Sequence, residues 1–176
     1  MIFKGLPLQG AFLIDIELRQ DDRGMFARVF CAREFEAQGL NPHIVQCNVS
    51  TNLRRGTLRG MHFQRAPFAE VKIVRCTRGA LYDVIIDIRP ASPTYLKWFG
   101  VELTEESHRM IYVPEGFAHG YQALTEGCEA FYMVTQFYSP RDEGAIRWDD
   151  PLFCIPWPIT PPVLSPKDAS HGDFEP

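Results

Sequence analysis

Turn-forming residues divide this chain into short β-type runs about every 8–12 positions, a spacing typical of β-sandwiches, barrels and jelly rolls. We expect strands over residues 11–18, 25–30, 44–50, 71–76, 80–88, 98–103, 110–113, 117–124 and 129–138. Residues 31–38 are the one early helix that the pattern predicts, because Gly39 and then Pro42 end it. The sequence therefore predicts an all-β protein with a few short helices.

Two connections carry further expectations about topology. The tripeptide Thr77-Arg78-Gly79 separates two of the predicted strands and is a hairpin signal. Residues 150–166 are rich in proline, so this tail should lie extended across the domain rather than form an inner strand. No repeat or boundary divides the chain, and residues 1–176 are predicted to form a single domain.

Composition argues against several classes of protein. The formal net charge is −4, whereas nucleic-acid-binding domains are usually basic. No apolar run approaches the ~20 residues of a membrane helix, and the N-terminus lacks the apolar stretch of a signal peptide. The five cysteines form no CxxC pair, and Cys47, Cys76 and Cys154 lie among apolar or strand-forming residues. We interpret them as reduced, buried small hydrophobes of a cytoplasmic protein.

A cationic group stands out on otherwise apolar β-type segments. It consists of Arg59, His62 and Lys72, and it favours an anionic ligand. Strict alternation puts Arg59 and His62 on opposite faces of a strand, but Gly60 between them permits a bulge that brings both to one side. A lone histidine on a strand is more often structural, yet an imidazole oriented by a carboxylate can serve as a general base.

Lys72 and Tyr132 each allow two interpretations. Lys72 alternates with Val71 and Ile73, so it lies on the opposite face from them. It is either a solvated outer residue or, inside a jelly roll, a group that stabilises an oxyanion. Tyr132 is either a core aromatic or a proton donor.

The sequence also allows two interpretations for other polar residues. Gln46, Asn48 and Ser50 share one face of a predicted strand. That face is either an ordinary solvent face or a row of hydrogen-bonding groups for a ligand. Arg23, in a predicted turn, is either a surface residue or, together with Arg59, a bidentate phosphate ligand.

Metal-binding and cofactor-binding patterns are missing. The position two residues after His62 is Gln64, no acidic residue follows at a short spacing, and the histidine nearest to His119 is His108. Two histidines without a paired acid do not predict a metal centre. The chain also lacks Walker, GxGxxG and GxSxG motifs. We therefore expect neither a metal nor a cofactor.

Several motifs, in order along the chain, are similar to those of one enzyme family. They include Asp22-Arg23-Gly24-x-Phe26, Gln46-x-Asn48-x-Ser50, Leu58-Arg59-Gly60-Met61-His62-Phe63-Gln64, Lys72-x-Val74-Arg75, Pro114-Glu115-Gly116-Phe117-Ala118-His119-Gly120 and Leu164-Ser165-Pro166-Lys167-Asp168. The chain resembles the dTDP-4-dehydrorhamnose 3,5-epimerases, the nucleotide-sugar epimerase branch of the cupins. The resemblance implies a metal-free cupin-type jelly roll (a double-stranded β-helix) that is usually dimeric through exchanged N-terminal strands.

The resemblance also implies roles for single residues. His62 matches the family's base, Asp168 its partner carboxylate, Lys72 the lysine that stabilises an enolate, and Tyr132 the acid on the opposite face. The implied substrate-binding residues, some of them acting across the dimer, are Arg23, Phe26, Arg28, Gln46, Asn48, Arg59, His119 and Tyr138. Arg28 departs from the family pattern, since many members carry glutamate there, and this bears on the choice of nucleotide and sugar.

The sequence therefore predicts an epimerase that inverts C3 and/or C5 of a nucleotide-linked 4-keto-6-deoxyhexose, as in dTDP-L-rhamnose biosynthesis for a bacterial surface glycan. We expect a cytoplasmic homodimer that binds neither nucleic acid nor membranes. One alternative is a sugar-nucleotide ketoisomerase on the same fold, against which Lys72 and Asp168 both argue. The other is a non-catalytic sugar-binding cupin, against which the full set of base, partner, lysine and tyrosine argues.

Overall fold

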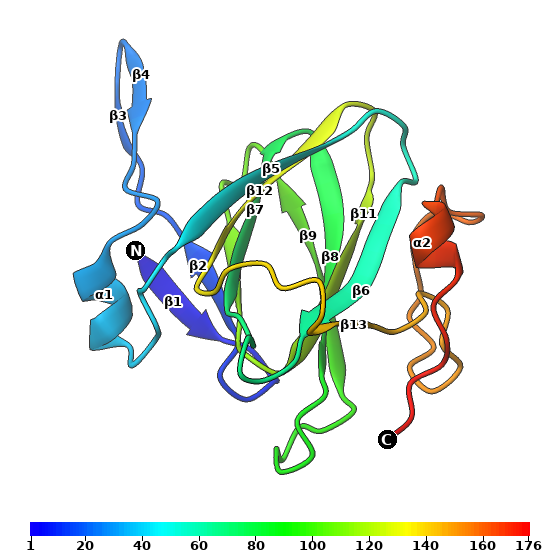
Figure 1. Cartoon of the computed structure of the whole chain (residues 1–176). Coiled ribbons are helices and arrows are strands. Elements are labelled where there is room, and N and C mark those ends of the chain that lie inside the picture. The colour runs from blue at the N-terminus through cyan, green and yellow to red at the C-terminus, as the bar shows by residue number, and fades with distance from the viewer.

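The computed structural model describes residues 1–176 and contains two antiparallel sheets that face one another (Figure 1). The six-stranded sheet has the order β1–β2–β10–β7–β12–β5. Its strands are β1 (Ile2–Gly5), β2 (Phe12–Asp15), β10 (Met110–Val113), β7 (Lys72–Arg78), β12 (Cys128–Val134) and β5 (Gln46–Asn52). The prediction of an all-β protein is confirmed.

The second sheet has five strands in the order β13–β6–β11–β8–β9. They are β13 (Glu143–Ala145), β6 (Leu58–Gln64), β11 (Phe117–Ala123), β8 (Ala80–Asp87) and β9 (Trp98–Thr104). A separate hairpin of β3 (Arg19–Asp21) and β4 (Gly24–Phe26), called the arm below, stands away from both sheets (Figure 1). The helices are α1 (Ala32–Ala37) and α2 (Pro166–Ala169), and neither is long and apolar enough to cross a membrane.

The central core fills the space between the two sheets. β7 contributes Val74 and Cys76, β8 contributes Leu81 and Ile85, and β11 contributes Tyr121. These residues alternate along their strands because successive side chains of a strand point to opposite faces of the sheet. The period of two in the sequence therefore becomes the inner faces of two packed sheets.

Each sheet is also covered on part of its outer face. Phe35 of α1 packs with Ile14 and Ile73 against the six-stranded sheet. Phe153 and Trp157 of the proline-rich tail pack against the outer face of the five-stranded sheet. The prediction that this tail lies across the domain is confirmed.

The hairpin predicted at Thr77-Arg78-Gly79 does not form. β7 pairs with β10 and β12, whereas β8 pairs with β9 and β11, so the two strands belong to different sheets. Gly79, at φ +73°, allows the chain to turn from one sheet into the other. A turn signal specifies that the chain changes direction, but the packing of the two sheets decides which strands become partners.

The remaining local predictions are mostly confirmed. The helix expected at residues 31–38 is α1, whereas the strands expected at 11–18 and 25–30 are limited to β2 and β4. All five cysteines are free, and Cys76 and Cys128 are buried. Cys47 and Cys154 are exposed, so the expectation of burial is wrong for these two. Cys47 lies on the outer face of β5, at the uncovered edge of its sheet.

Candidate active site

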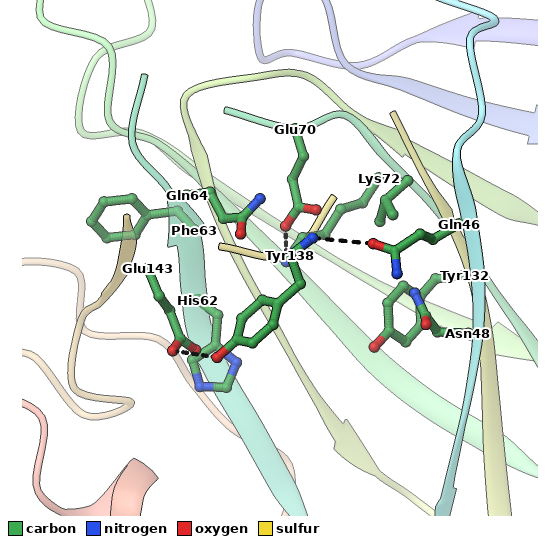
Figure 2. Close-up of a pocket in the computed structure, with 11 residues that line it drawn as sticks. Gln46, Asn48, His62, Phe63, Gln64, Glu70, Lys72, Tyr132, Tyr138 and Glu143 are labelled. Atoms are coloured by element: carbon green, nitrogen blue, oxygen red, sulfur yellow. Dashed lines mark hydrogen bonds and ion pairs between the residues drawn. The ribbon is translucent and has the colours of Figure 1, made fainter. Parts of the chain in front are cut away.

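A cavity of about 450 Å³ opens between the sheets, and a second of about 200 Å³ meets it. His62, Lys72 and Tyr132 line both spaces, which together are called the cleft below. Figure 2 shows His62 and Glu143 on one side of the larger cavity and Asn48 and Tyr132 on the other. The cleft is therefore built by residues from both sheets.

His62 on β6 and Asp168 on α2 form a histidine–carboxylate pair. His62 Nε2 lies 2.6 Å from Asp168 Oδ1. Ser165, the N-cap of α2, donates from Oγ to Asp168 Oδ2 at 2.6 Å and accepts from the Asp168 backbone N–H at 3.0 Å. Burial opposes ionisation of Asp168, but the hydrogen bonds from His62 and Ser165 outweigh it and lower the pKa of the carboxyl. The ionised carboxylate orients the imidazole and leaves its other nitrogen available to accept a proton.

The bulge predicted at Gly60 is confirmed. In the ladder between β6 and β11, His62 pairs with His119 and Arg59 pairs with Tyr121, so the register shifts by one residue between them. Both Arg59 and His62 consequently line the smaller cavity. Gly60 has φ +142°, and a Cβ added there would lie 2.5 Å from Gly120 Cα. Only glycine fits this close approach of two strands.

Lys72 faces the cleft from the opposite sheet. Its side chain is 14% exposed, and its Nζ lies 3.3 Å from Oε1 of Glu70. Val71 and Ile73 are buried on the outer face of the same sheet, under α1. The interpretation of Lys72 as a solvated outer residue is therefore wrong. The outer face of β7 is buried under α1, and Lys72 lies on the inner face.

Tyr132 lies on β12, on the same wall as Lys72. Burial raises the pKa of its phenol, with a smaller contribution from the nearby Tyr121 and Glu70. The hydroxyl of Tyr132 makes no hydrogen bond within the chain and remains protonated at neutral pH. Tyr132 can therefore donate a proton into the cleft from the side opposite His62.

The polar row on β5 also turns inward. Gln46 and Asn48 line the larger cavity and Ser50 the smaller one, whereas Val49 on the other face is exposed. The prediction that the polar residues share a face is confirmed, and the alternative of an ordinary solvent face is wrong. Gln46 Oε1 also accepts a hydrogen bond from the backbone N–H of Tyr138 at 3.1 Å.

A second histidine–carboxylate pair lies deeper in the cleft. His119 Nε2 lies 2.8 Å from Oδ2 of Asp83, a fully buried residue whose Oδ1 has no hydrogen-bond partner. No role for Asp83 was expected from the sequence, although an acidic residue within the apolar strand β8 is an unusual signal that could have identified it. Asp83 fixes the ring of His119 at the wall of the smaller cavity.

The chain matches known proteins over nearly its whole length. A sequence profile of the dTDP-4-dehydrorhamnose 3,5-epimerases matches residues 5–175. The chain belongs to this family. It is 44% identical to the dTDP-4-dehydrorhamnose 3,5-epimerase of Sinorhizobium fredii over 97% of this chain and 88% of that protein.

Solved structures of the family superpose closely on this epimerase fold. The dTDP-4-dehydrorhamnose 3,5-epimerase of Elizabethkingia anophelis has a TM-score of 0.96 and 36% identity, covering 99% of this chain and 96% of that one. A Legionella pneumophila epimerase in complex with dTDP-4-keto-L-rhamnose has a TM-score of 0.91 and 35% identity, covering 98% and 92%. The cupin-type jelly roll implied by the resemblance is thereby confirmed.

Three residues implied by the family pattern do not reach the cleft of their own chain. Arg23 and Phe26 lie on the arm, which points away from the sheets, and Arg28 follows it (Figure 1). Arg23 Nη2 pairs with Oδ2 of Asp21 at 2.6 Å, and Arg28 Nη1 pairs with Oε1 of Glu34 at 3.0 Å. Phe26 is 69% exposed. The arm therefore does not line the cleft of its own chain.

Glu143, which no sequence motif indicates, lies on β13 and lines the larger cavity of the cleft. The hydroxyl of Tyr138 donates to Glu143 Oε2 at 3.0 Å, and Lys167 Nζ donates to the same oxygen at 2.6 Å. Burial opposes ionisation, but these two hydrogen bonds outweigh it and lower the pKa of Glu143. Glu143 thus ties the Tyr138 loop to the residue before Asp168. No local pattern predicts this contact, because it depends on β13 pairing with β6.

His171 is a second residue that sequence analysis missed. Its Nε2 lies 3.8 Å from Asp168 Oδ1, and its ring meets that of His62 edge to face at 5.8 Å between centroids. No acidic residue lies at a short spacing from His62, but Asp168 pairs with it from 106 residues away, as the family resemblance implied. The epimerase chemistry itself is still predicted to need no metal.

Proposed function

We propose that the protein converts dTDP-4-keto-6-deoxyglucose by inverting C3 and C5, the two carbons beside the C4 ketone. The observation that carries the proposal is the placement of His62 and Tyr132 on facing walls of one cleft. Inversion of a carbon requires a proton to leave one face and another to arrive on the opposite face. A base and an acid on opposite walls meet that requirement.

His62 is the proposed base. Its free ring nitrogen takes the hydrogen on C3 or C5, which the neighbouring ketone acidifies, and the C–H electron pair forms an enolate with negative charge on the C4 oxygen. Asp168 holds the ring and stabilises its positive charge once the proton has moved. The hydrogen bonds of the buried Asp168 keep its carboxylate ionised and beside the ring through the reaction.

Lys72 and Tyr132 complete the proposed reaction. The ammonium of Lys72 stabilises the enolate oxygen, aided by Arg59 in the smaller cavity. Tyr132 gives its proton to the carbon from the other face as the enolate collapses back to the ketone. His119, fixed by Asp83, is proposed to bind the sugar next to this centre.

The nucleotide side of the cleft is proposed to include Gln46, Asn48 and Tyr138. A structural relative from Bacillus anthracis, 38% identical with a TM-score of 0.96, holds TDP and pyrophosphate. We further propose that the protein is a cytoplasmic homodimer, in which Arg23, Phe26 and Arg28 of one chain complete the cleft of the other. The exposed apolar side chains of Met25 and Phe26 on the arm support this arrangement, because large apolar groups of this kind are usually covered by a partner.

Incubation with dTDP-4-keto-6-deoxyglucose in D₂O tests the function. Deuterium should enter at both C3 and C5, with inversion at each, as followed by NMR. A relative from Streptomyces niveus, 37% identical, is a 3-epimerase, so exchange at C3 alone would reassign the protein to single inversion. Migration of the keto group would identify a ketoisomerase, and binding without exchange would identify a non-catalytic cupin.

A further inference from the structure

We propose that His62, Asp168 and His171 form an inhibitory site for Zn²⁺, at which the metal competes with the substrate for the base. His171 has no part in the proposed reaction. Zn²⁺ would regulate the cleft from this site and would have no part in catalysis.

The three side chains already converge. One donor atom from each lies within 4.8 Å of the other two. In a tetrahedral zinc site with bonds of 2.0–2.1 Å, ligand atoms are about 3.3 Å apart. The contact of Asp168 with His62 (2.6 Å) would open by about 0.7 Å and that with His171 (3.8 Å) would close by about 0.5 Å to reach this separation. Both changes are under 1 Å, and the two histidine donor atoms lie within the same 4.8 Å limit.

The unpaired nitrogen of His171 is the observation that points to a ligand. The side chain of His171 is only 15% exposed. Its Nε2 atom is buried and has no hydrogen-bond partner. Buried polar atoms without a partner are uncommon because they lose hydration and gain nothing in return. The tautomer with its proton on Nδ1 presents a lone pair at Nε2, and a metal would take it.

The surroundings suit a zinc ligand set. Two imidazoles and one carboxylate are donors that Zn²⁺ accepts, and the open cleft leaves a fourth position for water. Ser165 already orients the Asp168 carboxylate through its second oxygen at 2.6 Å. Hydrogen bonds of this kind to a ligating carboxylate fix its direction and support metal binding.

The charges nearby limit how tightly the ion binds. Glu143 and Asp168 favour a cation, whereas Arg59, Lys72 and Lys167 oppose it. This mixed environment fits a reversible inhibitory site rather than a permanent structural centre. A bound ion would occupy a ring nitrogen of His62 and neutralise Asp168, so the base could no longer be oriented or accept a proton.

Cobalt and zinc titrations test the site in a background with the exposed thiols removed (Cys47→Ser and Cys154→Ser). Co²⁺ should give the intense visible bands of a low-coordinate site, and Zn²⁺ should displace it. Zn²⁺ should inhibit deuterium exchange, and excess chelator should restore it. His171→Asn should keep basal exchange but raise the inhibitory Zn²⁺ concentration at least tenfold, whereas the exposed His43→Asn should behave like the background.

The cobalt bands do not depend on turnover, so this test is independent of the proposed epimerase reaction. His62→Asn should also lose the bands, since it removes a ligand. Equal Co²⁺ spectra and equal Zn²⁺ sensitivity in the background and His171→Asn proteins would overturn the proposal. Absence of any cobalt band in the background protein would overturn it as well.

Discussion

Replacing Tyr132 by phenylalanine should separate proton abstraction from inversion. The phenol of Tyr132 makes no hydrogen bond within the chain, and its ring packs beside the central core. Removal of the hydroxyl therefore breaks no structural contact, and the free energy of unfolding should change by less than about 0.5 kcal/mol. The effect on catalysis should be much larger, because the cleft offers no other acid in the same position.

The magnitude follows from the role of the residue. Burial raises the pKa of Tyr132, so the hydroxyl carries its proton throughout the neutral range and has one to donate. Loss of a general acid typically slows a reaction by about 10²–10⁴-fold, which corresponds to about 3–5 kcal/mol in the barrier. Inversion in Tyr132→Phe should fall by this amount. Exchange should persist, because the enolate still forms and solvent deuterium can re-enter from His62.

The assay follows deuterium and configuration at C3 and C5 together by NMR in D₂O. Tyr95→Phe, which makes the same chemical change in a loop far along the chain from the site residues, is the matched control and should behave like the wild type. His62→Asn should abolish exchange at every carbon, and Asp168→Asn should lie between, because it leaves the imidazole present but poorly oriented.

Two outcomes would refute this reasoning at different levels. A His62→Asn protein that is folded by circular dichroism and still exchanges at the wild-type rate would remove His62 as the base. Equal loss of exchange and inversion in Tyr132→Phe would overturn only the division of labour between the two residues.

Exhaustive chelation should leave epimerase activity intact, whereas loss of activity with rescue by one divalent ion would contradict the metal-free mechanism. Light scattering at micromolar concentration should give the mass of a dimer, and a monomeric mass would be inconsistent with a shared cleft. Arg28→Glu, which also breaks the contact with Glu34, should shift kcat/KM among dTDP-, CDP- and GDP-linked sugars while exchange persists; an unchanged preference would remove Arg28 from substrate choice. Burial opposes ionisation of Asp87, but hydrogen bonds, chiefly from Arg89, outweigh it and lower its pKa to about 2. The lowered pKa contributes about 2 kcal/mol to the free energy of unfolding above pH about 4, and this contribution is lost as pH falls toward 2. Urea unfolding should therefore show that Asp87→Asn is less stable than the wild type at pH 7, by a difference that shrinks in acid. A difference that stays constant with pH would refute this prediction.

Local physics made much of this fold readable from the sequence. Alternation along β5 showed that Gln46, Asn48 and Ser50 share a face, because a strand has a period of two whatever surrounds it. Gly60 allowed a bulge between Arg59 and His62, because only glycine accepts the required backbone angle and close approach. The residues of α1 and the proline-rich tail were likewise predictable from residues within a few positions of one another.

Tertiary structure alone decided which of these faces became a site. The sequence could not show that the polar face of β5 points inward, since the outer face of the same sheet, at Val71 and Ile73, is itself buried under α1. Nor could it place β7 and β8 in different sheets, because a turn signal does not name strand partners. Local spacing also hid the donors around His62, because Asp168 and His171 reach it through the packing of a distant tail. Side-chain chemistry is encoded residue by residue, but a functional site depends on long-range packing that brings those residues within reach of one another.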